Sequence, residues 1–132
     1  MKLLKYWYSA VILAMAHTLV SASPTSFSVC LKEKGVVLYS AWWCTYCFEQ
    51  LKEIDPSFVD PVEMAYPERV ATRFPFHKEC GGDPNGLLPD CVPKKANFGA
   101  PAVPTIGLSD GTIHVGKMDT KKLSELTSCA LP

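Results

Sequence analysis

The stretch Val36-Val-Leu-Tyr-Ser-Ala-Trp-Trp-Cys-Thr-Tyr-Cys47 decides how this chain is interpreted. Its first four residues form a continuous apolar run of the kind that is typical of a strand buried inside a sheet. Residues 40–43 then predict a turn, and the residues from Cys44 onwards predict an amphipathic helix that ends before Pro56. Two cysteines with two residues between them therefore stand where a buried strand turns into a helix.

This position favours redox chemistry at Cys44 and Cys47. The first cysteine of such a helix meets unsatisfied backbone N–H groups and the positive end of the helix dipole, and both stabilise a thiolate. We therefore predict that Cys44 is the nucleophile. Cys47 lies one turn later on the same helix face, so the two sulfurs can close and reopen a disulfide, and we predict that Cys47 is the resolving thiol.

Two other interpretations of the Cys44 and Cys47 pair stay open at this point. One is half of a zinc site, but a structural zinc site usually has a second short pair, whereas the next two cysteines, Cys80 and Cys91, have ten residues between them. We therefore expect no metal. The other is a permanent structural disulfide in a non-catalytic module that only binds client proteins.

The first 22 residues predict a cleaved secretory signal peptide. Residues 1–5 carry two lysines, residues 11–20 form a short apolar run, and Val20-Ser-Ala22 supplies the small residues that a signal peptidase requires. An uncleaved membrane anchor is the alternative, although a spanning helix needs roughly 20 apolar residues. We expect cleavage near Ala22 and export of residues 23–132 to the periplasm, an organelle lumen or the extracellular space.

The composition suits one globular domain in an oxidising compartment. A chain of 132 residues has room for a single domain, and its 13 basic and 13 acidic residues cancel, so we expect neither nucleic acid as a partner nor a strongly charged surface. All six cysteines follow Ala22, and an even number in an exported chain makes pairing the default. We expect a monomer with a hydrophobic core.

The remaining sequence predicts an α/β order of elements. We expect helices over residues 26–34, 44–54 and 90–97 and after residue 119, and strands over residues 36–39, 74–77, 103–108 and 112–115. Residues 56–72 are predicted to be irregular, with at most one helical turn. Leu123 and Leu126 are expected to form the apolar face of the last helix, and Ser109-Asp-Gly111 predicts a hairpin turn.

The other four cysteines are harder to assign than the first pair. Cys80 and Cys91 bracket a loop rich in Gly, Asp, Pro and Asn, and we predict a structural disulfide between them. A second redox pair that relays electrons to Cys44 and Cys47 is the alternative. Cys30 and Cys129 lie in the two predicted terminal helices. They are left over once the other four cysteines are assigned, and they are either paired with each other or free. His77 and His114 are interpreted as ordinary surface or edge residues.

Several motifs together carry a resemblance to a known family. The segment ending in Cys47 looks like the active-site segment of a thioredoxin-fold protein, and Val103-Pro-Thr105 resembles the cis-proline loop that faces this site. Residues 26–126 most resemble the thioredoxin-like domain found fused to, or partnered with, bacterial and plant homologues of vitamin K epoxide reductase. The residues that carry this likeness are Trp43-Cys-x-x-Cys-x-x-Gln50, Glu79-Cys80, Asp83-Pro-Asn85, Cys91, Pro104-Thr105 and Asp110-Gly111.

The resemblance implies a thioredoxin-like fold with a central mixed sheet and flanking helices. It also implies an exported protein disulfide oxidoreductase, acting as oxidase or isomerase, whose redox-active centre is Cys44 and Cys47. Trp43, Val103 and Pro104 would contact the client, because the loop at Pro104 presents the backbone of Val103 to an extended peptide. Thiol–disulfide exchange itself requires no cofactor.

The same family implies a membrane partner that re-oxidises the domain while it reduces a quinone. The sequence departs from the family in two ways: residues 55–73 are longer than usual, and no membrane-spanning reductase domain is present in the chain. That partner is therefore expected to act in trans, with loss of the partnership as the alternative. Leu38 stands six residues before Cys44, where cytosolic-type thioredoxins carry a buried acid, so reduction of clients is expected to be less favoured.

Overall fold

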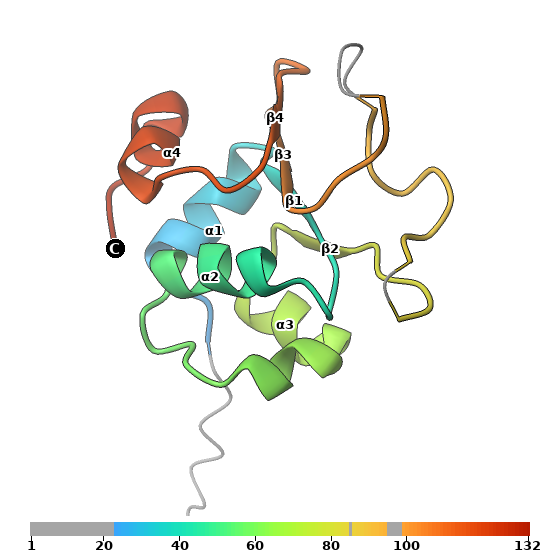
Figure 1. Ribbon diagram of the computed structural model, residues 1–132. Coiled ribbons are helices and arrows are strands. Elements are labelled where there is room, and N and C mark those ends of the chain that lie inside the picture. Colours follow the sequence, from blue (N-terminus) through green and yellow to red (C-terminus); the bar gives the residue numbers. More distant parts are fainter. Residues whose placement is uncertain (1–22, 85, 95–98) are drawn as a thin grey trace, which may run out of the picture.

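A mixed four-stranded sheet with helices around it forms the architecture of the protein (Figure 1). The computed structural model describes residues 23–84, 86–94 and 99–132. The strands are β1 (Val37–Ser40), β2 (His77–Glu79), β3 (Thr105–Gly107) and β4 (Ile113–Val115), in the order β2-β1-β3-β4. β1 is parallel to β2 and antiparallel to β3, and β3 is antiparallel to β4. The predicted α/β class is confirmed, and the arrangement agrees with a thioredoxin-like fold.

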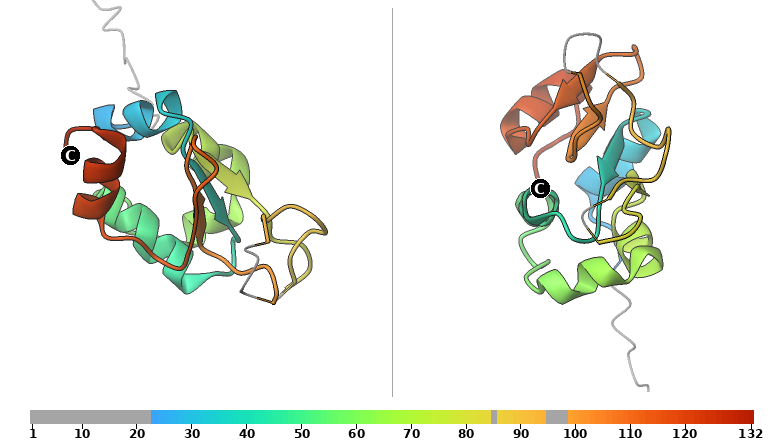
Figure 2. Two further views of the ribbon diagram at one scale, coloured as in Figure 1. Left: turned by 90° about the horizontal axis from the view of Figure 1, so that it is seen from above. Right: turned by 45° about the vertical axis from the view of Figure 1, so that its right-hand side comes forward.

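The helices surround this sheet and supply most of its apolar cover. They are α1 (Ser26–Glu33), α2 (Thr45–Ile54), the 3-10 helix η1 (Pro61–Ala65), α3 (Pro67–Arg73) and α4 (Thr120–Thr127). Figure 2 shows α2 and α4 side by side on one face of the sheet, while α3 follows η1 and leads into β2. None of the helices in the described ranges is both long enough and apolar enough to cross a membrane.

The hydrophobic core joins the central strands to all four α-helices. Leu38 of β1 pairs in register with Ile106 of β3, and both side chains are buried. The largest buried side chains that pack around them are Phe27, Leu31, Leu51, Ile54, Phe58, Met64, Phe74 and Leu123. On the side of α3 the core is aromatic, because the rings of Phe58 and Phe74 meet edge to face with centroids 5.1 Å apart.

The predicted N-terminal helix, first strand, hairpin and last helix are present. α1 ends before Gly35, which adopts φ +75°, but its N-cap is Thr25 rather than a serine. The hairpin closes through the Leu108 N–H, which donates to the Thr112 carbonyl at 2.9 Å. Asp119 caps α4 by accepting from two backbone N–H groups.

Four expectations from the sequence are corrected. Residues 56–72 contain η1 and most of α3, since Pro61 and Pro67 occupy first-turn positions, where a missing N–H costs nothing. The strand predicted over 74–77 lies two to three residues later, as β2. Leu126 is 48% exposed, so Leu123 alone forms the buried contact expected of this pair.

The fourth correction concerns the helix expected over residues 90–97. Residues 90–94 are turns and irregular chain, whereas residues 95–98, like the signal peptide predicted over residues 1–22, lie outside the described residues. Asp90 has φ +55°, which is the left-handed region and not the extended conformation of a helix N-cap. The Cys91 N–H closes a turn by donating to the Leu88 carbonyl at 3.4 Å, so the chain bends at the point where a helix was predicted to start.

Candidate active site

The turn from β1 into α2 places Cys44 at the very start of the helix. The Cys44 N–H donates to the carbonyl of Ala41 at 2.9 Å, which closes the turn. Cys44 is the N-cap of α2, and its Sγ accepts a hydrogen bond from the Cys47 N–H at 3.1 Å. The prediction put Cys44 in the first helical turn, and the structure places it one residue earlier, where its sulfur takes up one of the unsatisfied N–H groups of the helix.

Cys44 and Cys47 form a disulfide whose Cα atoms are 5.2 Å apart. Cys44 keeps 8% of its surface exposed, whereas Cys47 is fully buried. This exposure is small, yet it makes Cys44 the only residue of the pair with any solvent-exposed surface. Attack from outside is therefore directed to Cys44.

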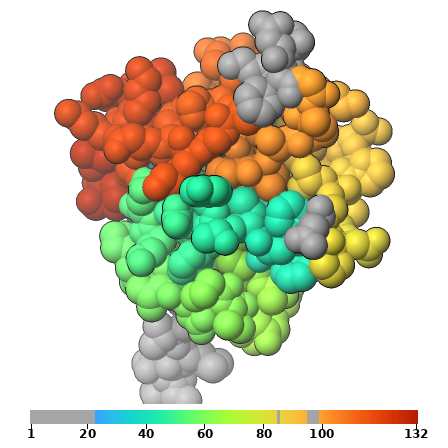
Figure 3. Space-filling model, in the orientation of Figure 1, coloured from blue at the N-terminus to red at the C-terminus, as the bar shows by residue number. Residues whose placement is uncertain are grey.

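The segment before β3 lies beside the start of α2. Thr105 pairs in register with Tyr39, so Pro104 lies at the end of β1 that leads towards Cys44. The Val103–Pro104 peptide bond is cis, as the resemblance implied. Val103 packs against the core cluster that includes both cysteines, and Figures 1 and 3 show this segment directly next to the first turn of α2.

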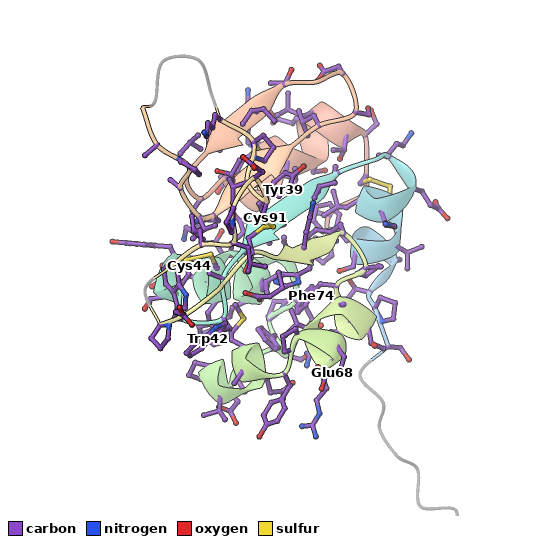
Figure 4. All side chains as sticks on the ribbon, turned by 90° about the vertical axis from the view of Figure 1, so that its right-hand side faces the viewer. Tyr39, Trp42, Cys44, Glu68, Phe74 and Cys91 are labelled. Carbon is purple, nitrogen blue, oxygen red and sulfur yellow. A yellow bond between two sulfur atoms is a disulfide. The ribbon has the colours of Figure 1, made fainter. Side chains whose placement is uncertain are left out.

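Exposed aromatic side chains flank Cys44 in the sequence, and an exposed leucine lies on the loop closed by the Cys80–Cys91 disulfide. Trp42 is 36% exposed and Tyr46 66%, whereas Trp43 is half-buried against the core. Leu88, from the loop between Cys80 and Cys91, is also exposed. In Figure 4, Trp42 and Cys44 lie on the same side of the molecule, next to the loop that carries Cys91.

The parallel pairing of β1 and β2 places Glu79 and His77 beside the strand that leads to the site. One carboxylate oxygen of Glu79 accepts from the Trp42 N–H at 3.0 Å and from the Gly81 N–H at 2.8 Å. Burial raises the pKa of Glu79, although these two hydrogen bonds act in the opposite direction. In the sequence, Glu79 belongs only to the Glu79-Cys80 motif, and no role for its side chain is predicted.

His77 is not the surface residue that the sequence suggested, because its side chain is 1% exposed. Its Nε2 lies 3.8 Å from the second carboxylate oxygen of Glu79, a distance that would suit an ion pair. Burial lowers the pKa of His77 to about 4, so at neutral pH the imidazole is uncharged. The alternation of side chains along a strand was the available signal, since it places residues 77 and 79 on the same face.

The remaining cysteines are paired as well. Cys80 and Cys91 form the predicted disulfide, and Cys30 and Cys129 form a third, which ties α1 to the chain beyond α4. Three disulfides are typical of an oxidising, exported environment. Within the described part of the chain, no group of three or more His, Cys, Asp or Glu residues is placed to hold a metal ion.

Comparison of the chain with protein-family models, curated proteins and solved structures found no match. A disulfide at the N-cap of a helix, in which only Cys44 keeps solvent-exposed surface, and a cis-proline segment beside it are compatible with a redox or disulfide-related role.

Proposed function

We propose that this protein is an exported thiol–disulfide oxidoreductase that exchanges disulfides with client proteins through Cys44 and Cys47. The observation that carries the proposal is the Cys44–Cys47 disulfide at the N-cap of α2. In this pair the Cys44 Sγ accepts a hydrogen bond from the Cys47 N–H, and Cys44 is the residue that keeps some solvent exposure. A hydrogen-bond donor aimed at a sulfur at a helix N-terminus stabilises the thiolate, which makes that sulfur a good leaving group and an accessible nucleophile.

In the oxidising direction a client thiolate attacks the Sγ of Cys44. The bond between Cys44 and Cys47 breaks, a mixed disulfide between the client and Cys44 forms, and Cys47 leaves as a thiolate. A second client thiolate then attacks the client sulfur of the mixed disulfide and releases Cys44. The client dithiol has lost two electrons and two protons, and the Cys44 and Cys47 dithiol has gained them. Isomerisation uses the same mixed disulfide when the protein is partly reduced.

The leucine at position 38, where a buried acid would assist reduction, favours oxidation of clients over their reduction. Leu38 is buried at 1% exposure in β1, the strand that leads to Cys44. A carboxylate buried under the cysteines would accept the proton of the resolving thiol and so assist reduction, and leucine has no such group. We therefore assign the protein the role of an oxidase, with isomerisation as its second activity.

The client is proposed to lie across the exposed edge of Cys44. Trp42, Tyr46 and Leu88 supply exposed apolar surface of the kind that contacts unfolded chains. Trp43, Val103 and Pro104 complete the proposed contact, with the backbone before β3 available to an extended peptide.

Continued turnover requires an oxidant for the Cys44 and Cys47 dithiol. By the resemblance of its sequence to the domains that accompany vitamin K epoxide reductase homologues, we assign this role to a membrane protein in trans. That partner would take up the two electrons and two protons and pass them to a quinone, which becomes a quinol. Trapping mixed disulfides with Cys47→Ala in the native host tests this assignment, because the variant retains Cys44 and lacks the thiol that releases the bound protein.

Two assays on the purified protein test the proposed activity: oxidation of reduced ribonuclease and reduction of insulin. The unaltered protein should accelerate the first more than the second, and Cys44→Ser should abolish both. The control is the Cys30→Ala/Cys129→Ala variant. It also lacks one disulfide, but that disulfide joins α1 to the chain beyond α4 and includes neither cysteine of the candidate site. Full activity of Cys44→Ser would contradict the assignment of the nucleophile.

The reduction potential of the Cys44–Cys47 pair separates catalysis from a purely structural role. A potential between those of known exchange catalysts, about −120 to −270 mV, supports the oxidoreductase. A potential far below about −300 mV would mark an inert disulfide and favour a module that only binds clients.

A further inference from the structure

One carboxylate oxygen of Glu79 connects two segments that are far apart in the sequence. Glu79 is the last residue of β2, and its Oε1 accepts from the N–H of Trp42, in the turn before Cys44, and from the N–H of Gly81, directly after Cys80. The side chain of Glu79 is only 17% exposed, although the hydrogen bond from Trp42 lies on the exposed side of the site and the one from Gly81 is partly buried.

Close contact between Trp42 and Gly81 reinforces the link. A Cβ atom at Gly81 would lie 2.6 Å from the Glu79 Oε1 and 2.8 Å from the Cδ1 of Trp42, which is closer than such atoms can approach. The absence of a side chain at Gly81 therefore lets the indole ring and the carboxylate both lie against its backbone.

The segment that carries Glu79 is itself firmly held. The Cys80 N–H donates to the Ser40 carbonyl at 2.7 Å, which continues the pairing of β2 with β1. The Cys80 carbonyl accepts from the Leu88 N–H at 2.7 Å, and the disulfide to Cys91 closes the loop. Glu79 therefore attaches the turn before α2 to a rigid support.

We propose that Glu79 is a positioning residue of the Cys44–Cys47 site, which holds the turn at Trp42 against the loop of the Cys80–Cys91 disulfide. The turn is closed by the hydrogen bond from Cys44 to Ala41 and places the Cys44 Sγ 3.1 Å from the Cys47 N–H. If Trp42 is released, this distance is no longer fixed and the Cys44 thiolate loses part of its stabilisation. The role deepens the proposed function and rests on it.

The two hydrogen bonds that Glu79 accepts from Trp42 and Gly81 are here called the clamp. The effect of this clamp can be separated from the effect of the negative charge of Glu79. The second oxygen of Glu79 faces the Nε2 of His77 at 3.8 Å, and neither atom has a hydrogen-bond partner among the described residues. In Glu79→Gln the amide oxygen can still accept from Trp42 and Gly81, while the amide nitrogen can donate to His77. Glu79→Gln thus keeps the clamp without the charge, and Glu79→Ala removes both.

The first measurement is the alkylation rate of Cys44 by iodoacetamide as a function of pH, in protein reduced with dithiothreitol and read at Cys44 by mass spectrometry. We expect Glu79→Ala to react about tenfold more slowly at pH 7, because the Cys44 pKa rises, and Glu79→Gln to stay within about twofold of the unaltered protein. Equal rates for all three proteins would overturn the proposal. Equal changes in Gln and Ala variants would also overturn it, since the charge and not the clamp would then act.

The second measurement is the equilibrium of the Cys44–Cys47 pair with a glutathione redox buffer. Here Glu79→Ala should shift the equilibrium constant about tenfold towards the disulfide, which corresponds to about 30 mV, and Glu79→Gln should not. If the unaltered protein is not reduced at all, the proposed oxidoreductase function fails, whereas the alkylation measurement still decides the role of Glu79. The two failures are thereby distinguished.

A matched pair of glycine variants provides an independent test in case Glu79→Ala does not fold. Gly81→Ala pushes against both Glu79 and Trp42, whereas a Cβ at Gly82 would meet ordinary contacts at 3.6 Å or more. We expect Gly81→Ala to lower the Cys44 alkylation rate and Gly82→Ala to leave it unchanged. A slower rate in Gly82→Ala, or an unchanged rate in Gly81→Ala, would contradict the proposal.

Discussion

The Cys47 N–H donates to the Sγ of Cys44 at 3.1 Å, so the helix that carries the buried cysteine also stabilises the exposed one. The two residues are thus unequal although their side chains are chemically identical. Cys44 combines an exposed edge with a hydrogen-bond donor, and Cys47 has no contact with solvent.

This asymmetry predicts different reactivities for the two single-cysteine variants of the site. Cys47→Ser leaves Cys44 with its exposed edge and the N–H of residue 47, whereas Cys44→Ser leaves a fully buried Cys47. We expect iodoacetamide at pH 7 to modify Cys44 at least about tenfold faster than Cys47, as measured by mass spectrometry of the two variants. Similar rates would show that burial does not protect Cys47.

We expect substitution of Gln50 to cause a large loss of stability. It donates from Nε2 to the Met118 carbonyl at 2.9 Å and accepts from the Met118 N–H at 2.7 Å, and both residues are buried. Gln50→Ala leaves these two backbone groups without partners, so we expect the free energy of unfolding to fall by about 3 kcal/mol in urea titrations. Lys52→Ala, exposed on the same helix, is the control and should change it by less than about 0.5 kcal/mol. Comparable effects of the two substitutions would contradict this assignment.

The two disulfides outside the site should differ in their contribution to stability. Cys30 and Cys129 are 99 residues apart and Cys80 and Cys91 are 11 apart, while each pair joins a buried to a half-buried cysteine. In the chain-entropy model, loops of about 100 and about 15 residues contribute about 4.7 and about 3 kcal/mol. Replacing both cysteines of a pair by alanine should therefore destabilise more for the first pair. Denaturant titration that finds the reverse order would rule out the entropic explanation.

The elements that are determined by residues close together in the chain could be predicted from the sequence. The apolar strand, the turn with two cysteines and the helix after it follow from local hydrophobic spacing, and the hairpin follows from Asp110 and Gly111. Helix α3 falls largely within the segment predicted to be irregular, because Pro67 disfavours a helix interior but suits the first helical position, where it starts this helix.

The support of the candidate site could not be predicted in the same way. The hydrogen bond from Trp42 to Glu79 joins residues 37 apart and exists only because β1 and β2 pair in parallel with Ser40 opposite Glu79. Nothing near Glu79 in the sequence indicates that pairing. His77 was placed at the surface for the same reason, since its burial depends on what covers β2.

Because His77 is buried, we expect the stability of the fold to decrease in acid. Its pKa is lowered to about 4 in the folded protein from 6.5, so between these values the unfolded chain binds a proton that the folded protein does not. Stability should therefore be full above pH 6.5 and fall as the pH decreases towards 4, by about 3 kcal/mol in total. Glu79, whose pKa is raised by burial, acts in the opposite direction and offsets part of this loss.

Two histidine variants isolate this effect. His77→Gln should flatten the decrease in stability between pH 6.5 and 4, whereas His114→Gln should retain it, because the hydrogen bond of His114 to the Lys117 carbonyl lies at the surface. Urea titrations at half-unit intervals down to pH 4 measure the two profiles, and any contribution of Asp55, which is unchanged in both variants, is common to them. If His77→Gln follows the unaltered protein throughout, His77 is protonated as readily in the folded chain as in the unfolded one, and its burial does not govern the acid response.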